Sequence, residues 1–415
     1  MSSKHSIHSA TFNGPAPLPS NVFFATPAQR IGLARQRFFD EGVRPSGLVA
    51  EPVIQSWTRC LQKSRRPSEP IAFEPVTKAR IASTLARNRV LLAAAMDDLG
   101  QLEATLAGTA CKAILTDAHG VVVHATHSER DEGALMWLAG RVGVDLAEEC
   151  VGTTAPGVVA KSGQSCVVHG AEHFFDTNRV MYCAAAPIRD TRGELVAVLD
   201  LSCEMQPFRF DAASVVRLYA TAIENRLLSA QSRQHVVLRF QATASLLNTP
   251  FEGLAAVDDK GRVAWINAAG ASLLAAPREQ VRGANAEEVL GLDLAQLLAI
   301  AHSGRVTMQR MPNGLMLWLQ AHLHALGGQA IATPEILPRL EAPAASAASP
   351  VAATDVPPGS HARAADASLH EANRQLIDRA LAACQGNVSR AARELGVSRG
   401  LIYRRLRQAG SPPAG

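Results

Sequence analysis

Residues 181–202 read "MYCAAAPIRDTRGELVAVLDLS" and contain two apolar runs separated by the turn residues 190–193. Apolar runs bounded in this way predict two strands joined by a tight turn. The stretch "CKAILTDAHGVVVHAT" (111–126) repeats the pattern, and "QSCVVHG" (164–170) is a β-branched run closed by glycine. Together with intervening helical segments, these runs predict an α/β domain with a single twisted sheet that is covered on at least one face.

The segment "HGAEH" (169–173) fits the H-x-x-E-H pattern of a zinc protease. That chemistry requires a helix that puts both histidines on one face, with the glutamate beside the bound water. Here His169 ends a predicted strand and Gly170 interrupts the chain beside it. We therefore predict a structural strand-to-helix corner, and a zinc-dependent hydrolase using His169, Glu172 and His173 is the alternative.

The whole stretch 152–202 resembles the GAF domain of the acetoin-catabolism-regulator branch of sigma-54-dependent activators. The segment "VIQSWTRCLQKS" (53–64) resembles the helical lead-in that precedes this domain. The resemblance implies a sensor whose sheet and helices enclose a small metabolite. Effectors in that family include acetoin, glycerol-derived ketones, alcohols and aromatics.

Pockets for small molecules are mostly apolar, with a few polar groups that orient the ligand. The residues that we predict to face the effector are Trp137, Cys166, His169, Tyr182, Cys183 and Ala185. Among them, His169 and Tyr182 are favoured, because each brings a polar group to an otherwise apolar strand. No cofactor is predicted, and the identity of the effector stays open.

Residues 211–245 contain no proline or glycine, and their apolar residues approximate a seven-residue repeat. This pattern predicts a long connector helix, either a coiled coil between two subunits or an amphipathic helix packed on its own domain. The following stretch, "PFEGLAAVDDKGRVAWINAAGASLLAA" (250–276), reads as strand, turn, strand and a helix opened by Asn267. It resembles the start of a PAS domain.

Positive charge is concentrated near the C-terminus. The whole chain has a net charge of +4, whereas residues 374–407 contain eight arginines against Asp378 and Glu394, which is +6. Such a distribution is typical of a nucleic-acid module attached to a neutral body. Within this segment, Gly386 and Gly396 separate three helical patterns. The spacing predicts a helix-turn-helix whose last helix enters a DNA groove.

The segment "GNVSRAARELGVSRGLIYRRLRQAG" (386–410) resembles the Fis-type DNA-binding segment of bacterial sigma-54-dependent activators. It departs from many relatives at Gly400-Leu401, where they have a threonine next to the glycine, so no base contact is predicted from that position. The predicted DNA-binding residues are Asn387, Ser389, Arg390, Ser398, Arg399, Gly400, Tyr403, Arg404 and Arg407.

The chain has 415 residues, no apolar run of 18 or more, and no apolar core within its polar N-terminus. We therefore expect no signal peptide and no membrane partner, and a cytoplasmic location. The seven cysteines are odd in number and form no C-x-x-C pair. Reduced buried thiols are predicted, with redox sensing as the alternative.

The P-loop string G-x-x-x-x-G-K-[ST] does not occur in this sequence. An ATPase that remodels sigma-54 polymerase needs that loop to hold phosphates. The sequence therefore predicts a non-enzymatic transcriptional regulator that reads a metabolite and binds double-stranded DNA without ATP-dependent sigma-54 activation. A homodimer is expected, with RNA polymerase as a further contact, and a sensor scaffold that acts by protein contacts is another alternative.

The predicted fold class is multidomain α+β, with a GAF-like α/β sensor, a PAS-like α/β domain and a C-terminal all-α helix-turn-helix. The predicted boundaries are a disordered N-terminus at 1–29, a helical lead-in at 30–106, the GAF-like sensor at 107–208, the connector helix at 209–246, the PAS-like domain at 247–325, a flexible linker at 326–368 and the Fis-type segment at 369–412.

Overall fold

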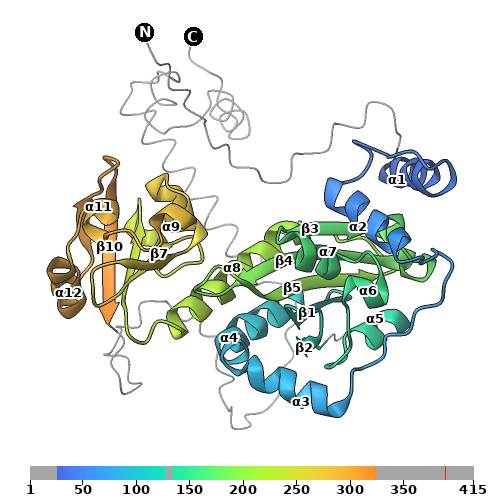
Figure 1. Ribbon diagram of the computed structural model, residues 1–415, viewed down its shortest axis with the longest axis horizontal. Coiled ribbons are helices and arrows are strands. Elements are labelled where there is room, and N and C mark those ends of the chain that lie inside the picture. The colour runs from blue at the N-terminus through green and yellow to red at the C-terminus, as the bar shows by residue number, and fades with distance from the viewer. Residues whose placement is uncertain (1–25, 128–132, 324–387, 389–415) are drawn as a thin grey trace, which may run out of the picture. The chain divides into compact units, whose positions relative to one another are not determined.

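Two five-stranded antiparallel sheets form the framework of the computed structural model, which describes residues 26–127, 133–323 and residue 388 (Figure 1). The predicted linker and Fis-type segment lie outside the described residues, apart from residue 388, as does the predicted disordered N-terminus up to residue 25. The prediction of disorder is wrong for residues 27–29, which begin a helix. The described part of the chain otherwise falls within one compact unit, residues 1–335.

The first sheet has the strand order β2-β1-β5-β4-β3, and every neighbouring pair is antiparallel. The hairpins predicted around residues 117–120 and 190–193 are confirmed as the β1–β2 and β4–β5 connections. The strands are β1 (Cys111–Asp117), β2 (Val122–Ala125), β3 (Cys166–His169), β4 (Met181–Arg189) and β5 (Leu195–Glu204).

Helices cover both faces of the first sheet. The helical elements of this part are α1 (Pro27–Arg35), the π-helical turn η1 (Gln36–Asp40), α2 (Glu51–Gln62), α3 (Lys78–Arg87), α4 (Arg89–Leu106), α5 (Ala134–Ala139), α6 (Glu148–Val151), α7 (Ala155–Ser162), the 3₁₀ turns η2 (Gly170–Glu172) and η3 (Asp176–Val180), and α8 (Ala212–Ala230). One buried cluster joins the sheet to α1, α2, α5, α6 and α7, and a second joins its other face to α4 and α8.

The alternation of side chains along β5 explains why this strand is apolar almost throughout. Val198 belongs to the cluster on the α2–α7 side, whereas Leu199 and Leu201 belong to the cluster on the α4–α8 side. Successive side chains of a strand point to opposite faces, so a central strand between two helical layers buries both sets. Asp200 and Ser202 are therefore polar residues inside a fully buried element.

The second sheet has the order β8-β7-β6-β10-β9, again antiparallel. The predicted hairpin and the Asn267 cap are confirmed, since the Asn267 side chain accepts a hydrogen bond from the Gly270 backbone at the start of α9. The elements are β6 (Val236–Gln241), the 3₁₀ turn η4 (Ala244–Leu246), β7 (Gly253–Val257), β8 (Val263–Ile266), α9 (Ala268–Leu274), α10 (Arg278–Val281), α11 (Ala286–Leu290), α12 (Leu294–Ser303), β9 (Thr307–Arg310) and β10 (Met316–Leu323).

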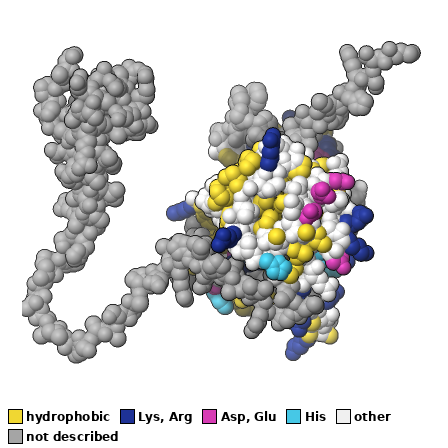
Figure 2. All heavy atoms as spheres, turned by 90° about the vertical axis from the view of Figure 1, so that its left-hand side faces the viewer, with side chains coloured by type: hydrophobic (Ala, Val, Ile, Leu, Met, Phe, Trp, Pro, Cys, Tyr) yellow, Lys and Arg dark blue, Asp and Glu magenta, His cyan; other side chains and the backbone are white. Residues whose placement is uncertain are grey.

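Apolar side chains remain exposed on the outer hairpin of the second sheet. Met308 on β9 and Met316 on β10 are each 50% exposed. Figure 2 views the molecule from this side and shows hydrophobic side chains on the surface. Exposed apolar side chains beside an edge strand are typical of a contact surface.

The prediction of a long connector helix over residues 209–246 is wrong for the second half of that range. Helix α8 ends at Ala230, and residues 236–241 form β6, a strand inside the second sheet. Strand β6 pairs with β7 on one side and β10 on the other, and its Val236, Leu238 and Phe240 side chains are buried in the core of this sheet. The second α/β part therefore begins before residue 247.

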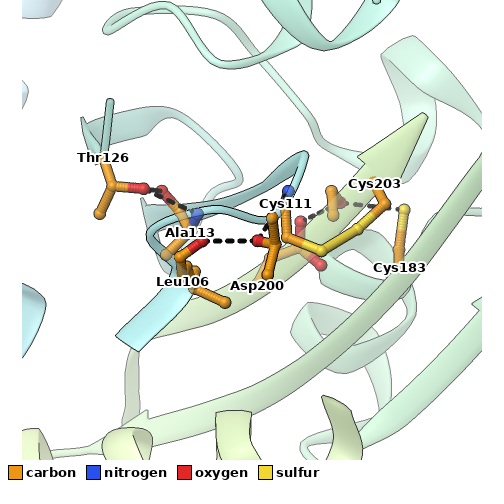
Figure 3. The surroundings of a disulfide bond; sticks show 9 residues. Leu106, Cys111, Ala113, Thr126, Cys183, Asp200 and Cys203 are labelled. Carbon is orange, nitrogen blue, oxygen red and sulfur yellow. Dashed lines mark hydrogen bonds between the residues drawn. A yellow bond between two sulfur atoms is a disulfide. The ribbon is translucent and has the colours of Figure 1, made fainter. Parts of the chain in front are cut away.

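The prediction of reduced thiols is also wrong for two of the cysteines. Cys111 and Cys203 form a disulfide between β1 and β5 (Figure 3). Cys60, Cys150, Cys166 and Cys183 are free. No described helix has the length and apolar character needed to cross a membrane.

Candidate functional site

A small cavity lies inside the first α/β part, against the sheet face that packs on α2–α7. Its volume is about 30 Å³. Its apolar walls are Phe73, Ile114, Met136, Ala139, Leu146, Pro156 and Met181, and its polar lining is Thr154, His173, Asn178, Cys183, Asp200 and Ser202. No lysine or arginine is among these lining residues, and nearly all of the surface that they expose to the cavity is apolar.

The polar side of the cavity is a chain of hydrogen-bonding side chains. The Ser202 hydroxyl lies 2.6 Å from Asp200 Oδ2 and 3.1 Å from Cys183 Sγ. Cys183 Sγ in turn lies 3.5 Å from His173 Nε2, and His173 Nδ1 lies 3.0 Å from the Gly170 carbonyl. A carbonyl only accepts, so Nδ1 carries the imidazole proton and Nε2 accepts from the Cys183 thiol.

Burial favours the neutral forms of these groups. It lowers the pKa of His173 to about 4 and raises the pKa of Asp200 to about 7, the latter opposed by the hydrogen bond from Ser202. Burial also raises the pKa of the Cys183 thiol well above its ordinary range. Taking an ion out of water without a partner is costly, so each group retains its neutral form over a wider pH range.

Two oxygens of residues that line the cavity have no hydrogen-bond partner among the described residues. They are Oδ1 of Asp200 and Oδ1 of Asn178, both in buried side chains. The Asn178 amide is oriented by its Nδ2, which donates to the Val151 carbonyl at 3.2 Å. A buried polar atom without a partner costs free energy, so a molecule that hydrogen-bonds to these two atoms is stabilised here.

The predicted effector residues divide between the two faces of the sheet. Cys183 lines the cavity, and Cys166 and Ala185 belong to the same buried cluster. His169 and Tyr182 lie on the opposite face, with ring centroids 5.6 Å apart. The side chains of the two faces alternate, so neither reaches this cavity.

Trp137 of α5 was predicted to point inward, and the structure places it at the surface. It is 59% exposed, and the Arg141 guanidinium lies over its ring. The preceding residue, Met136, is fully buried and lines the cavity instead. Contact between an effector and any of the six predicted residues stays a prediction.

The H-x-x-E-H segment forms the predicted corner. Strand β3 ends at His169 and the 3₁₀ turn η2 starts at Gly170. Glu172 is buried, and its Oε2 accepts from the His169 backbone N–H at 2.8 Å. His173 lies on the cavity side and His169 on the other, so the two imidazoles do not converge. Within the described residues, no group of three or more His, Cys, Asp or Glu side chains is arranged to hold a metal ion.

The helical lead-in holds the segment that carries His173. The buried Arg35 of α1 donates to the carbonyls of Ala171, His173 and Phe174 and pairs with Asp176. Burial lowers the pKa of Arg35 to about 10. From α2, Trp57 Nε1 donates to the Glu172 carbonyl at 2.7 Å.

Another buried contact ties α2 to α6. The Arg59 guanidinium pairs with both oxygens of Glu148, each at 2.7 Å, and the Ser56 hydroxyl donates to the same carboxylate at 2.6 Å. Bidentate pairs of this kind fix orientation as well as distance. The lead-in is therefore part of the wall that closes the cavity.

Four polar residues that line the cavity were not among the predicted effector residues, namely Asp200, Ser202, His173 and Asn178. One signal was present for the first two, since Asp200 and Ser202 interrupt the apolar run "LVAVLDLS" (195–202). A carboxyl inside a buried strand is rare unless it has a partner or a function. His173 and Asn178 lie in irregular turns, and nothing in their spacing indicated that they approach β5.

Two parts of the chain match known protein families. Residues 25–220 match the family described as MimR, N-terminal domain, and residues 368–408 match the family described as bacterial regulatory protein, Fis family. This combination fits the sigma-54 activator-like branch of transcriptional regulators and confirms the resemblance drawn from the sequence. The nine predicted DNA-binding residues fall within the second match but outside the described residues.

Individual relatives carry names of operon regulators. The acetoin catabolism regulatory protein of Cupriavidus necator is 31% identical over 226 residues, which cover 53% of this chain and 34% of that protein. The propane 2-monooxygenase operon transcriptional activator MimR of Mycolicibacterium smegmatis is 28% identical over 222 residues, 51% of this chain and 35% of that protein. This chain thus matches about a third of the length of these relatives.

A third relative, the glycerol metabolism operon regulatory protein of Citrobacter freundii, is 23% identical over 267 residues, 61% of this chain and 40% of that protein. Among solved structures, that of the E. coli DhaR(N)–DhaL complex aligns with a TM-score of 0.42 and 18% identity, over 66% of this chain and 99% of that chain. The structure of Pseudomonas aeruginosa HmgR aligns with a TM-score of 0.26 and 14% identity, over 48% and 96%.

Proposed function

We propose that this chain is a transcriptional regulator that binds a small, uncharged, hydrogen-bonding metabolite in the cavity and binds specific double-stranded DNA through residues 369–412. The observation that carries the sensor part is the pair of buried oxygens, Asp200 Oδ1 and Asn178 Oδ1, which have no hydrogen-bond partner and belong to residues that line the cavity. The Fis-family match at 368–408 supports the DNA-binding part.

The chemistry of the lining favours an uncharged effector. A carboxylate or phosphate would meet no cation there, and its desolvation would be uncompensated. A ligand hydroxyl donates to a buried oxygen and accepts from a neighbouring hydroxyl or thiol. Small alcohols and hydroxyketones have this chemistry together with an apolar body for the opposite wall.

The small size of the cavity implies movement on binding. A volume of about 30 Å³ holds about two water molecules. An effector of several carbon atoms therefore requires the walls to separate, and the walls include Phe73 from the lead-in side and Met136 of α5. Binding that displaces a wall stabilises one conformation over another, which is what a sensor requires.

Helix α8 offers a route from the first sheet to the second. Val216, Ile223 and Leu227 of α8 pack under the first sheet, and Leu228 packs against the second. The Asn225 side chain of α8 also accepts a hydrogen bond from Asn267 at 3.0 Å. We assign the first sheet to a GAF-like sensor and the second to a PAS-like domain, with α8 between them.

The regulator acts as a homodimer in this proposal, with two recognition helices on half-sites about one helical turn apart. Apolar side chains exposed on the second sheet support self-association. Because the sequence has no P-loop, ATP-driven remodelling of sigma-54 polymerase is not part of the mechanism. In this proposal the regulator acts by occupying a DNA site or by contacting RNA polymerase.

A thermal-shift screen of the purified chain tests the effector site, since a ligand that binds only the folded state raises the melting temperature. We expect small alcohols and hydroxyketones to raise it and carboxylates of equal size to leave it unchanged. Asn178→Ala should abolish the shift. Tyr182→Phe, on the opposite face, should retain it.

The reverse result, a shift lost in Tyr182→Phe and kept in Asn178→Ala, would move the effector to the other face of the sheet. Fluorescence anisotropy with labelled promoter fragments tests the DNA part of the proposal. A ligand that raises the melting temperature but changes neither DNA affinity nor spacing preference would contradict effector control of DNA binding.

A further inference from the structure

The Cys111–Cys203 disulfide joins the ends of two neighbouring strands. Cys111 is the first residue of β1, and Cys203 is one residue before the end of β5. The two residues are directly opposite in the antiparallel ladder, with Cα atoms 4.6 Å apart (Figure 3). This separation is that of the closely spaced positions in antiparallel pairs, where facing side chains come nearest.

The disulfide lies on the other face of β5 from the cavity. Cys203 and Leu201 belong to the cluster under α4 and α8, whereas Asp200 and Ser202 line the cavity. Cys203 follows Ser202 in the chain and holds the disulfide on one face of β5. The Ser202 hydroxyl hydrogen-bonds to Asp200 and Cys183 on the other face. A change in the pairing at this end of β5 therefore displaces groups on both faces.

The position of the disulfide also governs its access to a reductant. Cys111 is 5% exposed and Cys203 is 4% exposed, so attack on either sulfur requires a local opening. Residues 107 and 108, shortly before β1, are exposed, so the ladder ends close to solvent. The ends of ladders open at much lower free energy than their centres.

The other buried cysteines among the described residues compete little with Cys111 and Cys203 for thiol–disulfide exchange. Burial raises the pKa of Cys60 to about 11 and of Cys166 to about 12, and it raises the pKa of Cys183 well above its ordinary range. The thiolate is the reactive form, so these three thiols are poor nucleophiles. The pKa of Cys150 is also raised by partial burial, but this thiol is exposed, so it provides an accessible control.

We propose that Cys111 and Cys203 form a reversible redox site, which a dithiol reductant opens and a disulfide of the same class closes. Disulfides of proteins in reducing compartments are mostly transient and often serve as sensors. Closure fixes the start of β1 against β5 beneath α4 and α8, and opening frees that end of the sheet. The effect on effector affinity rests on the function proposed above, whereas the redox chemistry does not.

The exchange proceeds in two displacements. A thiolate of the reductant attacks one protein sulfur, forms a mixed disulfide and releases the other cysteine, which takes up a proton. The second thiol of the reductant then attacks the mixed disulfide, releases the remaining cysteine and closes its own disulfide. Two electrons and two protons thus pass from the dithiol to the protein, and oxidation reverses both steps.

The test uses the full chain in buffers of graded ratios of reduced to oxidised dithiothreitol, followed by alkylation and peptide mass spectrometry. We expect Cys111 and Cys203 to become alkylated together, along a single two-electron transition. Loss of the cross-link, which spans a sequence separation of 92 residues, should lower the melting temperature by about 5 °C or more. Hydrogen exchange should increase at residues 111–117 and 195–204.

The matched control is Cys150→Ser, which should keep both the transition and the shift in melting temperature. The double variant Cys111→Ala with Cys203→Ala should lose the dependence of melting temperature on reductant. If that variant fails to fold, the titration of the unaltered chain decides alone. Alkylation of both cysteines at every ratio, or of neither in excess reductant, overturns the proposal. No effector or DNA is needed, so failure of the proposed function leaves this test unaffected.

Discussion

Asp200 is a carboxyl placed where water cannot reach it. Its side chain is 1% exposed, and burial raises its pKa to about 7, with one opposing hydrogen bond from Ser202. In the unfolded chain an aspartate ionises near pH 4. Between about pH 4 and pH 7 the folded state therefore binds more protons than the unfolded state, and the contribution of this group to stability falls as pH rises.

Asp200→Asn should remove this pH dependence. We expect the free energy of unfolding of the variant, relative to the unaltered chain, to rise by about 2–3 kcal/mol between pH 5 and pH 8, since one pKa unit is worth about 1.4 kcal/mol. Urea unfolding at both pH values measures the difference. Asp259→Asn, an exposed turn residue, is the control and should show no such trend. Parallel pH curves for Asp200→Asn and the unaltered chain would mean that Asp200 is charged in the folded state.

Gly152 connects α6 to α7 in a conformation that only glycine adopts readily, with φ of +69°. A Cβ at this position would lie 2.7 Å from the ring of Phe175, which is fully buried. Gly152→Ala should therefore combine backbone strain with overpacking and cost about 2–4 kcal/mol. Chemical denaturation measures this loss.

Gly193 provides the matched control for that substitution. Its φ is +81°, but a Cβ there would meet no atom within 4 Å. Gly193→Ala should cost about 1 kcal/mol, from backbone strain alone. Equal losses at the two positions would show that the Phe175 ring moves aside.

At the scale of elements, one arginine ties the lead-in helix α1 to the segment 171–176. Arg35 donates to three carbonyls and one carboxylate of the segment 171–176, which carries His173 into the cavity. Arg35→Lys keeps the charge but loses the planar fork, so we expect a loss of about 2–4 kcal/mol. Hydrogen exchange within residues 171–176 should increase at the same time.

Arg44→Lys is the control for Arg35→Lys. Arg44 pairs with Glu51, and both side chains are about half exposed. Exposed pairs contribute little, so this variant should stay within about 0.5 kcal/mol of the unaltered chain. If exchange at 171–176 is unchanged in Arg35→Lys, the lead-in does not position His173.

Local patterns determined which elements the sequence could reveal. The hairpins at 117–120 and 190–193 and the Asn267 cap follow from turn and cap chemistry within a few residues. Strand β6 did not, because "HVVLRFQ" (235–241) fits both an apolar helical repeat and a strand. Its pairing with β10, about eighty residues later in the chain, makes it a strand.

Strands β3 and β4 carry five of the six predicted effector residues, and these five divide between the two faces of the sheet. Tyr182 and Cys183 are neighbours on β4 and point to opposite sides of the sheet. Helices cover both faces, so the apolar pattern does not distinguish the face with the cavity. Asn178 and His173 reach the cavity from irregular turns, and only the folded chain brings them to Asp200.

For the whole molecule, the proposal requires the basic C-terminal segment to bind DNA. Arg404 and Arg399 belong to the predicted recognition helix in the Fis-family match. Arg404→Ala should weaken binding of the full chain to duplex DNA, and Arg399→Ala should also relax sequence preference, by about 1–3 kcal/mol each if the arginine reads a base. Fluorescence anisotropy at several salt concentrations measures both effects.

The salt dependence separates the two kinds of contact. An arginine that neutralises one phosphate releases counterions, so its loss should reduce the slope of log affinity against log salt by about 0.9. An arginine that reads only a base changes affinity for one sequence and leaves the slope nearly unaltered. Arg305→Ala, an exposed arginine before β9, removes the same charge elsewhere and should change neither quantity. Equal effects from Arg305→Ala and Arg404→Ala would mean that net charge, rather than a recognition helix, holds the DNA.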